Sequence, residues 1–289
     1  MSQPVDPQRE QPSTYFVEDR SNQAEMIRLQ VQDQMITDGM GGVLPEQPDP
    51  TRFERVLDIG CGTGHWLIEA AKTYPTMKLL IGVDISSSIL RYAREQAAAQ
   101  HVADRVEFHL MDALRMLEFP HNFFDIVNLR YGMSWLRTWD WPKLLQEAKR
   151  VIRPGGIIRL TESDYDADES YPSLKRLTGL FVQVFYHTGH LFAPDKDGII
   201  SYLAQLLQRA GYQDIQTCSH RLEFRAGTLG GQRFAEDVKL IFQTAVPFFR
   251  RWTHLPDNYE EIYQQMLQEV QRQDFVQTST LLTAWGTRQ

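Results

Sequence analysis

The chain has 289 residues, a length that fits one large α/β domain with insertions. Its apolar share of 42% is typical of a globular protein, and no stretch reaches the roughly 18 uninterrupted apolar residues of a membrane span. The formal net charge of -7 argues against a polyanion as the main partner, so neither nucleic acid nor a membrane is expected as a partner.

The amino-terminal residues MSQPVDPQREQP are polar and rich in proline, and they lack the apolar core of a secretory signal. We therefore expect a cytoplasmic protein whose residues 1–20 are flexible. Cys61 and Cys218 are the only cysteines, and they form no CxxC pair and no Cys/His cluster. The sequence thus predicts two reduced thiols, with neither a disulfide framework nor a metal site.

The first half of the chain alternates between helical and strand-like segments. A helix is predicted over Ser21–Thr37, where apolar residues recur on one stripe, and the glycines of DGMGG at 38–42 are expected to end it. Alternation of this kind is typical of βαβ units, so five parallel strands in a sheet covered on both faces are predicted by residue 162. The segments that follow the first helix are RVLDIG, a helix over 65–73, LLIGVDIS, a helix over 87–100, VEFHLMD, FDIVNLRY, a helix over 142–152 that ends in RPGG, and GGIIRLTES.

After residue 162 the alternation of short strands and helices gives way to longer helical stretches rich in aromatic residues. Helices are predicted over 173–191 and 198–210, and the strand-like segment DIQTCSHRLEF follows. A further helical insertion is predicted over 231–273, before the alternating strand VQTSTLLTAWGT closes the chain.

Three glycines at 60, 62 and 64 follow the first predicted strand and mark a sharp turn. Turns of this type bind dinucleotides, phosphates or an adenosyl sulfonium. Asp58 lies at the carboxyl end of the strand, where open α/β sheets bind ligands. A carboxylate there repels a pyrophosphate and attracts an ammonium group, so Asp58 favours a ligand that carries an amino acid.

Two further acidic residues follow the next strands. Asp84 ends the second strand and can accept hydrogen bonds from both hydroxyls of a ribose, which alone does not separate NAD from other adenosyl ligands. Asp112 can accept from an adenine amino group, while Met111 and Ala113 press on the ring. The three acids together indicate a binding site for an adenosyl group at the carboxyl ends of the strands.

Over about 53–164 the chain resembles the class I S-adenosylmethionine-dependent methyltransferases in the order and spacing of five segments. These are VLDIGCGTG, GVDIS, the Asp of HLMDA, FDIVNLR and the RPGG turn. The resemblance implies a Rossmann-like seven-stranded sheet whose last strand is antiparallel, with LEF and STLLTAW in the sixth and seventh strands. It also implies S-adenosyl-L-methionine as cofactor. The implied cofactor-binding residues are Asp58, Gly60, Cys61, Gly62, Gly64, Asp84, Ile85, Met111, Asp112, Ala113, Asn128 and Tyr131, with Arg28 as a candidate for the cofactor carboxylate.

The segment YFVEDRSNQAEMIRLQVQD resembles the opening of the LaeA-like, secondary-metabolite branch of these enzymes. Glu25, Arg28, Leu29 and Gln32 recur at the spacing of that branch, although a proline usual before the acidic residue is missing. The resemblance implies a helical lid over 21–50 that closes over the cofactor. We therefore expect one methyltransferase domain over 21–289, with a core over 53–164 and cap insertions over 171–195 and 228–273.

Plainer roles compete with several of these assignments. Asp112 would also serve as a helix cap, and Arg28 would also pair with Glu25 on an exposed helix face. Cys61 fits a small buried filler better than a nucleophile. Tyr131 would also fit the core, because large aromatic residues beside a sheet usually pack there.

Methyl transfer to a small, partly apolar metabolite is the predicted function, with an oxygen, nitrogen or carbon acceptor all left open. NLRY differs from the Asn-Pro-Pro-aromatic motif of DNA and protein amino-methylating families, and the predicted caps are rich in aromatic residues. Proximity and exclusion of water suffice for the displacement, but an acceptor with a proton to lose benefits from a base. The candidates are His187 and His190, in a wall of the acceptor pocket over Tyr171–Phe192, and Glu162.

Three alternative functions stay open at this point. They are a protein or nucleic-acid methyltransferase of the same fold, a nicotinamide-dependent oxidoreductase, and a pericyclase-like relative that keeps the cofactor without transferring methyl. The sequence also leaves open whether the chain forms a homo-oligomer.

Overall fold

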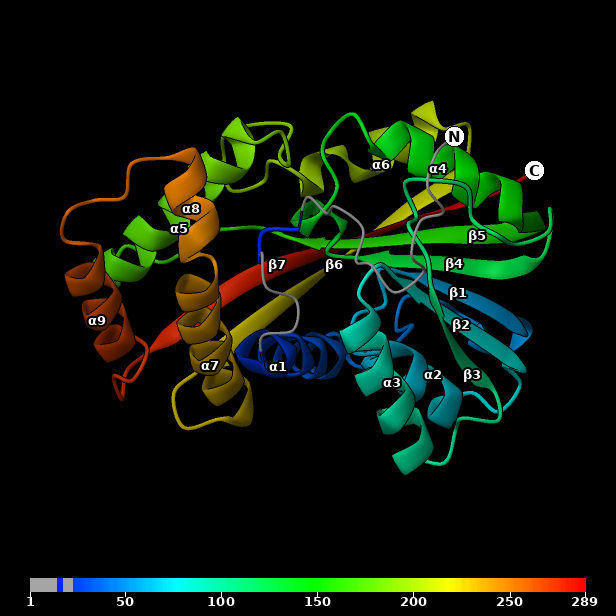
Figure 1. Cartoon of the computed structure of the whole chain (residues 1–289), viewed down its shortest axis with the longest axis horizontal. Coiled ribbons are helices and arrows are strands. Elements are labelled where there is room, and N and C mark those ends of the chain that lie inside the picture. Colours follow the sequence, from blue (N-terminus) through cyan, green and yellow to red (C-terminus); the bar gives the residue numbers. More distant parts are fainter. Residues whose placement is uncertain (1–14, 18–22) are drawn as a thin grey trace, which may run out of the picture.

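The computed structural model describes residues 15–17 and 23–289, which surround one seven-stranded sheet of order β3-β2-β1-β4-β5-β7-β6 (Figure 1). Strands β1 to β5 run parallel, whereas β7 is antiparallel to both of its neighbours, β5 and β6. This confirms the predicted α/β class with an antiparallel last strand. The strands are β1 (Arg55–Ile59), β2 (Leu79–Asp84), β3 (Val106–Leu110), β4 (Phe124–Arg130), β5 (Ile152–Ser163), β6 (Gln213–Arg225) and β7 (Val276–Thr287).

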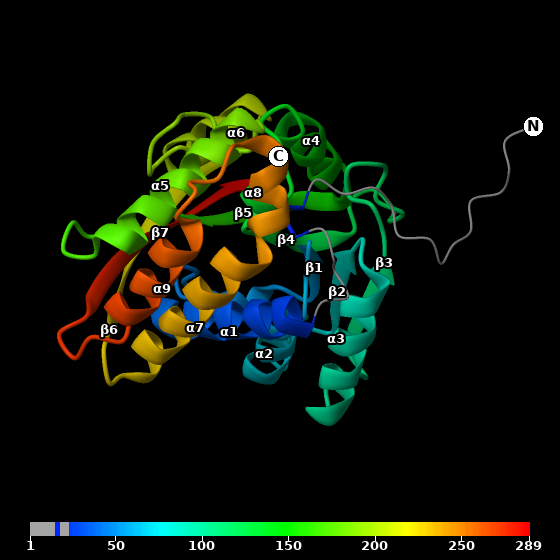
Figure 2. The same ribbon diagram turned by 60° about the vertical axis from the view of Figure 1, so that its left-hand side comes forward.

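Helices cover both faces of the sheet and gather at one end of it (Figures 1 and 2). Helices α2 and α3 pack on one face, α4 and α6 on the other, and α1 lies against α7. Helices α5, α8 and α9 lie beyond the carboxyl ends of the parallel strands. The helices are α1 (Gln23–Met40), α2 (His65–Thr73), α3 (Ser87–Ala99), α4 (Trp141–Val151), α5 (Pro172–His187), α6 (Leu203–Arg209), α7 (Leu229–Thr244), α8 (Val246–Trp252) and α9 (Tyr259–Glu269).

Four helix boundaries differ from the sequence-based expectation. The first helix was expected over 21–37, but residues 21 and 22 lie outside the described part, and α1 continues to Met40, where two glycines with positive φ end it. The helix expected over 173–191 ends at His187, because Gly189 adopts a left-handed conformation. The stretch over 198–210 divides into a 3-10 turn and α6, and the insertion over 231–273 divides into α7, α8 and α9.

The hydrophobic core has two layers, one on each face of the parallel strands. Val56, Ile126 and Ile157 are cross-strand neighbours in β1, β4 and β5, and they pack in the layer that contains α2 and α3. The next residues along the same strands pack in the opposite layer, with α4 and α6. Burial on both faces explains why these strands are continuous apolar runs in the sequence.

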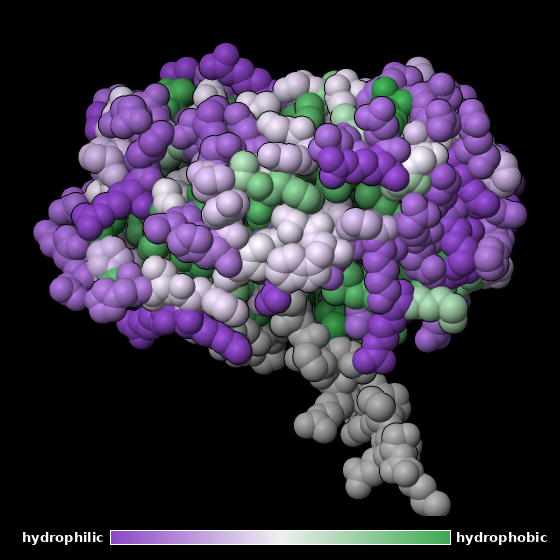
Figure 3. All heavy atoms as spheres, turned by 90° about the horizontal axis from the view of Figure 1, so that it is seen from above, coloured by the Kyte–Doolittle hydropathy of each residue, from purple (hydrophilic) through white to green (hydrophobic). Residues whose placement is uncertain are grey.

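One face of the molecule is predominantly polar. Hydrophilic side chains dominate the face seen from above in Figure 3, with hydrophobic ones in smaller groups between them. Within the part of the chain that the structure describes, no helix combines the length and apolar character that crossing a membrane requires.

The glycine-rich turn joins β1 to α2 at the carboxyl edge of the sheet. Gly60, Gly62 and Gly64 all have positive φ, between 51° and 74°, a region that side chains disfavour. A Cβ atom on Gly64 would lie 2.5 Å from the Phe108 ring, whereas one on Gly62 would meet nothing within 4 Å. Gly64 therefore serves close packing, and Gly62 leaves open space above the loop.

Gly64→Ala is expected to lower the free energy of unfolding by about 2 to 4 kcal/mol, because it adds a clash with Phe108 to backbone strain. Gly227→Ala is the matched control, since Gly227 has φ of 78° and nothing within 4 Å of its added Cβ. Urea denaturation would measure both variants. Equal losses in the two would show that packing on Phe108 does not constrain the turn.

Candidate active site

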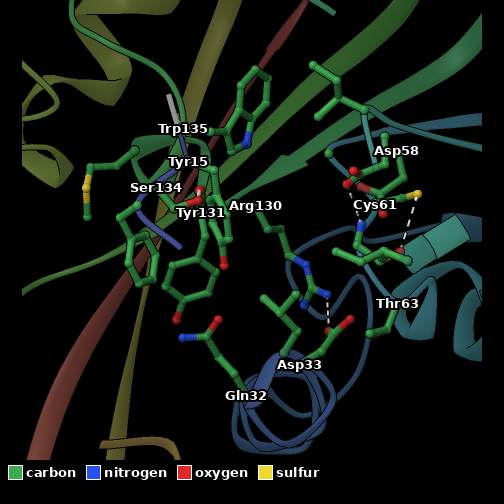
Figure 4. Close-up of a pocket in the computed structure, with 18 of the residues that line it drawn as sticks. Tyr15, Gln32, Asp33, Asp58, Cys61, Thr63, Arg130, Tyr131, Ser134 and Trp135 are labelled. Carbon is green, nitrogen blue, oxygen red and sulfur yellow. Dashed lines mark hydrogen bonds and ion pairs between the residues drawn. The ribbon is translucent and has the colours of Figure 1, made fainter. Parts of the chain in front are cut away.

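A cavity of about 210 Å³ lies at the carboxyl ends of β1 to β4, between the glycine-rich turn and α1 (Figure 4). Asp58, Cys61 and Thr63 border one side of it, while Gln32 and Asp33 reach it from α1. The loop that follows β4 supplies a further wall. Most of the predicted cofactor-binding residues line this cavity: Arg28, Asp58, Gly60, Cys61, Gly62, Asp84, Ile85, Met111, Asp112, Ala113 and Tyr131.

Two predicted cofactor-binding residues do not line the cavity. Gly64 packs against Phe108 at the start of α2. Asn128 is fully buried in β4, where its Nδ2 donates a hydrogen bond of 2.8 Å to Asp58 Oδ1. The structure thus gives both residues supporting positions behind the cavity wall.

Asp58 lies at the floor of the cavity and is 4% exposed. Burial raises the pKa of its carboxyl to about 7, although Arg130 and the hydrogen bond from Asn128 oppose the shift. The carboxyl therefore changes charge near neutral pH, and a cation in the cavity would stabilise its ionised form.

A row of buried, hydrogen-bonded polar side chains runs from Asp58 across the neighbouring strands to Glu46 in the loop after α1. Asp58, Asn128 and Arg159 are cross-strand neighbours in β1, β4 and β5. Arg159 Nη1 donates to Asn128 Oδ1 at 2.8 Å, and Arg159 Nε donates to Glu46 Oε1 at 2.8 Å. Burial opposes ionisation of Glu46, but the adjacent Arg159 guanidinium outweighs it and holds the pKa of Glu46 below its usual value.

Asp84 and Asp112 both hold backbone of the loops that border the cavity. Asp84 accepts from the backbone N–H groups of Gly62 at 3.2 Å and Ser86 at 2.9 Å. Asp112 accepts from the Leu114 N–H at 3.0 Å and forms an ion pair with Arg115 at 3.4 Å. The carboxylate of Asp84 thereby fixes the glycine-rich turn and lines the cavity at the same time.

Arg28 is buried, which differs from the exposed pair considered as its plainer role. Its guanidinium donates to Glu25 through Nε and Nη2 at 2.9 and 2.8 Å, to Asp237 through Nη1 at 3.0 Å, and to the Tyr15 hydroxyl. These acceptors engage every nitrogen of the guanidinium. Arg28 therefore joins α1 to α7 and is poorly disposed to receive a further carboxylate.

Arg130 is a cavity residue that the sequence analysis missed. It follows the last apolar residue of β4, pairs with Asp33 of α1 and donates to Thr37 Oγ1 at 3.2 Å (Figure 4). Its position just before the aromatic residue of NLRY was the available signal, because side chains at the carboxyl ends of parallel strands face the ligand crevice.

Tyr131 and Cys61 also line the cavity, in distinct ways. Tyr131 has φ of 52°, a left-handed conformation that is uncommon for a large residue and often marks functional sites. Cys61 is 6% exposed, and burial raises the pKa of its thiol. The thiol is therefore neutral, which agrees with a packing role rather than that of a nucleophile.

The three predicted bases all lie outside the lining of the cavity. His187 is exposed at the end of α5, while His190 is fully buried, with Nδ1 2.8 Å from Thr188 Oγ1. Glu162 is also fully buried and accepts from the Met133 N–H at 3.2 Å, and burial raises its pKa to about 8. None of the three lines the cavity as the structure describes it, and their role as bases stays a prediction.

Comparison with known proteins agrees with this geometry. Residues 56–156 match the family described as "Methyltransferase domain". The chain is 32% identical over 170 residues to demethylmenaquinone methyltransferase of Lactiplantibacillus plantarum, a match that covers 55% of this chain and 70% of that protein. The chain belongs to the class I S-adenosylmethionine-dependent methyltransferases. Its cofactor is S-adenosylmethionine, and this methyltransferase has the carboxylates and the open glycine turn that suit such a ligand.

Two further relatives span more of the methyltransferase. The probable methyltransferase ltbC of Aspergillus luteorubrus is 28% identical over 228 residues, which covers 75% of this chain and 78% of that protein. The structure of Haemonchus contortus phosphoethanolamine N-methyltransferase 2, in complex with phosphomonomethylethanolamine and S-adenosylhomocysteine, aligns with a TM-score of 0.56 at 18% identity. That alignment covers 95% of this chain and 60% of the nematode protein, and it supports the fold.

Glu46→Gln is expected to lower the free energy of unfolding by about 3 kcal/mol, because it leaves the Arg159 guanidinium buried without a counter-charge. The side chains of Arg159 and Glu46 are 0% and 1% exposed. Glu54→Gln is the control, since its ion pair with Lys78 is exposed and should contribute less than about 1 kcal/mol. Urea denaturation would measure both variants. Similar losses of unfolding free energy would contradict the conclusion that burial makes the Glu46–Arg159 pair the more important one.

Proposed function

We propose that this methyltransferase transfers the methyl group of S-adenosylmethionine to a small, partly apolar acceptor. The observation that carries the proposal is the composition of the cavity wall away from the glycine-rich turn. Phe16, Tyr165 and Phe181 line it, and Met133 and Ile241 add aliphatic surface. A wall of this kind favours an apolar or aromatic molecule with few polar groups.

The proposed cofactor position follows from the other half of the cavity. Asp58 would attract the ammonium group of the methionine portion, and Asp84 would accept hydrogen bonds from the ribose hydroxyls. The adenine would lie between Met111 and Ala113, beside Asp112. Arg130 suits the cofactor carboxylate better than Arg28 does. Arg130 has one acidic partner, Asp33, whereas Arg28 already has two.

The proposed lid over 21–50 is extended by residues 15–17, which pack over the same cavity. Tyr15 and Phe16 line the cavity, and the Phe16 ring lies 5.5 Å from the Phe185 ring and 6.3 Å from the Phe181 ring, between centroids. Packing of this kind would exclude water from the methyl group. Both aromatic partners belong to α5, so the lid and the predicted acceptor wall are one packed unit.

Methyl transfer then rests on proximity within a closed cavity. The cofactor supplies a good leaving group, so the protein has to align the acceptor atom with the methyl carbon and exclude water. Burial raises the pKa values of the Tyr131 and Tyr165 phenols, which makes both hydroxyls neutral hydrogen-bonding groups rather than bases. We therefore expect His187→Ala and His190→Ala to retain the chemical step.

The relatives favour a small molecule over a macromolecular acceptor. Demethylmenaquinone methyltransferase is named for a small-molecule substrate, and the fungal relative ltbC gives some support for the secondary-metabolite branch. A pericyclase-like enzyme that keeps the cofactor without transferring methyl is the second candidate. None of the three predicted bases lines the described cavity, and this favours the second candidate as much as it favours transfer by proximity.

The proposed function predicts a methylated product. The full chain, incubated with S-adenosylmethionine and a panel of small aromatic phenols and amines, should give a product whose mass increases by one methyl group, with equimolar S-adenosylhomocysteine. Mass spectrometry checks both products, and calorimetry with NAD as the control ligand should show no binding. Conversion of an acceptor without mass gain would instead favour the pericyclase-like candidate.

Cofactor affinity is expected to fall below pH 7, by up to about tenfold per pH unit, because the cofactor ammonium binds the ionised form of Asp58. The groups that face Asp58 are Arg130, Asp33 and Arg159, together with Asn128. Asp58→Asn should weaken binding and remove this pH dependence, as calorimetry would show. Glu162→Gln is the control: Glu162 has a pKa of about 8 but lies outside the cavity lining, so its loss should leave the profile unchanged.

A further inference from the structure

A second cavity of about 110 Å³ adjoins the first, among α1, α5, α7 and the ends of β6 and β7. Tyr131, Tyr165 and Ile241 line both cavities, and so do Gln32, Ile36 and Phe181. The two cavities therefore share part of their walls. The second cavity lies on the acceptor side, because neither the glycine-rich turn nor the loops after β2 and β3 contribute to it.

The wall of the second cavity combines apolar surface with one distinctive carboxylate. Phe224, Phe234 and Leu281 contribute apolar groups. Asp164 also lines the cavity, is 9% exposed and accepts from the Thr280 N–H at 2.9 Å. Among the described residues it forms no ion pair within 4.0 Å, and the more distant Lys196 ammonium and Asp197 carboxylate, both in the loop after α5, act on it with opposite signs.

The two other carboxylates of the second cavity are paired, which sets Asp164 apart. Asp237 Oδ1 lies 3.0 Å from Arg28 Nη1, and Asp166 Oδ1 lies 2.7 Å from Lys175 Nζ. The cavity is therefore apolar over most of its surface and acidic at Asp164. Such a site attracts a hydroxyl or an amine and repels a carboxylate or a phosphate.

We infer that the second cavity receives the far end of the acceptor, which is an elongated, largely apolar molecule that carries a hydroxyl or amine donor at that end. The inference rests on the proposed function, because it takes the first cavity as the place of methyl transfer. It adds a selection rule: acceptors with an anionic far end are excluded. A phosphorylated amine such as the ligand of the nematode relative would fail this rule.

The test uses three probes of equal length, 4-phenylbutylamine, 4-phenylbutanol and 4-phenylbutyrate, titrated by calorimetry into the full chain saturated with S-adenosylhomocysteine. The amine and the alcohol should bind at least about tenfold more tightly than the carboxylate. Asp164→Asn should reduce the preference for the amine over the carboxylate by about tenfold or more. An unchanged ratio of amine to carboxylate affinity in Asp164→Asn would overturn the inference.

Thr178→Phe gives an independent arm, because Thr178 lines the second cavity and not the first. The phenylalanine should fill the space and weaken binding of the amine and of the alcohol alike. Unchanged affinity for these two probes would overturn the inference. Both variants should keep the affinity of the wild-type chain for S-adenosylhomocysteine, which also checks that they fold. If the wild-type chain does not bind S-adenosylhomocysteine, the proposed function itself is contradicted. If it methylates an acceptor but binds the amine, the alcohol and the carboxylate equally well, only the role of the second cavity is contradicted.

Discussion

The buried row of Glu46, Arg159, Asn128 and Asp58 is the interaction on which the cavity depends. Glu46 and Arg159 carry opposite charges at one end of the row, where their side chains are removed from solvent, and the Asp58 carboxyl lies at the other end. Each member has a hydrogen-bonding partner in the next, so the desolvation cost of each is offset only while the row is intact. The orientation of Asp58 toward the cavity is thereby set by a residue two strands away and by the loop after α1.

Helix α1 is held to the sheet and to the cap by charged groups as well as by packing. Arg130 of β4 pairs with Asp33 on one side of the cavity, and Arg28 pairs with Asp237 of α7 on the other. Both arginines also line the cavity. Charged groups at this depth are stable only with partners, so any movement of α1 away from the cavity would need to exchange these partners for water or for groups of a ligand.

The sheet and the cofactor half of the cavity could be predicted from the sequence because their signals are local. Apolar runs bounded by turns mark β1, β2 and β4, and the glycines fix the turn between β1 and α2. Arg159 could not be assigned from sequence, because its contacts depend on the register of β5 against β4 and on where the loop after α1 places Glu46. The positions of His187 and His190 relative to the cavity could not be predicted either, because the direction of the chain after α5 depends on packing of Gly189 against Trp139.

The long strands β6 and β7 continue together beyond the end of β5. The pairing of β5 with β7 ends at Ser163 and Leu281, while residues 276–280 of β7 pair with β6 alone. This two-stranded extension contributes Phe224 and Ser279 to the second cavity and nothing to the glycine-rich turn. On the proposed role of the second cavity, substrate preference and cofactor binding belong to separate parts of one continuous sheet, so mutations in the extension would redirect the enzyme to new acceptors while its use of S-adenosylmethionine is preserved.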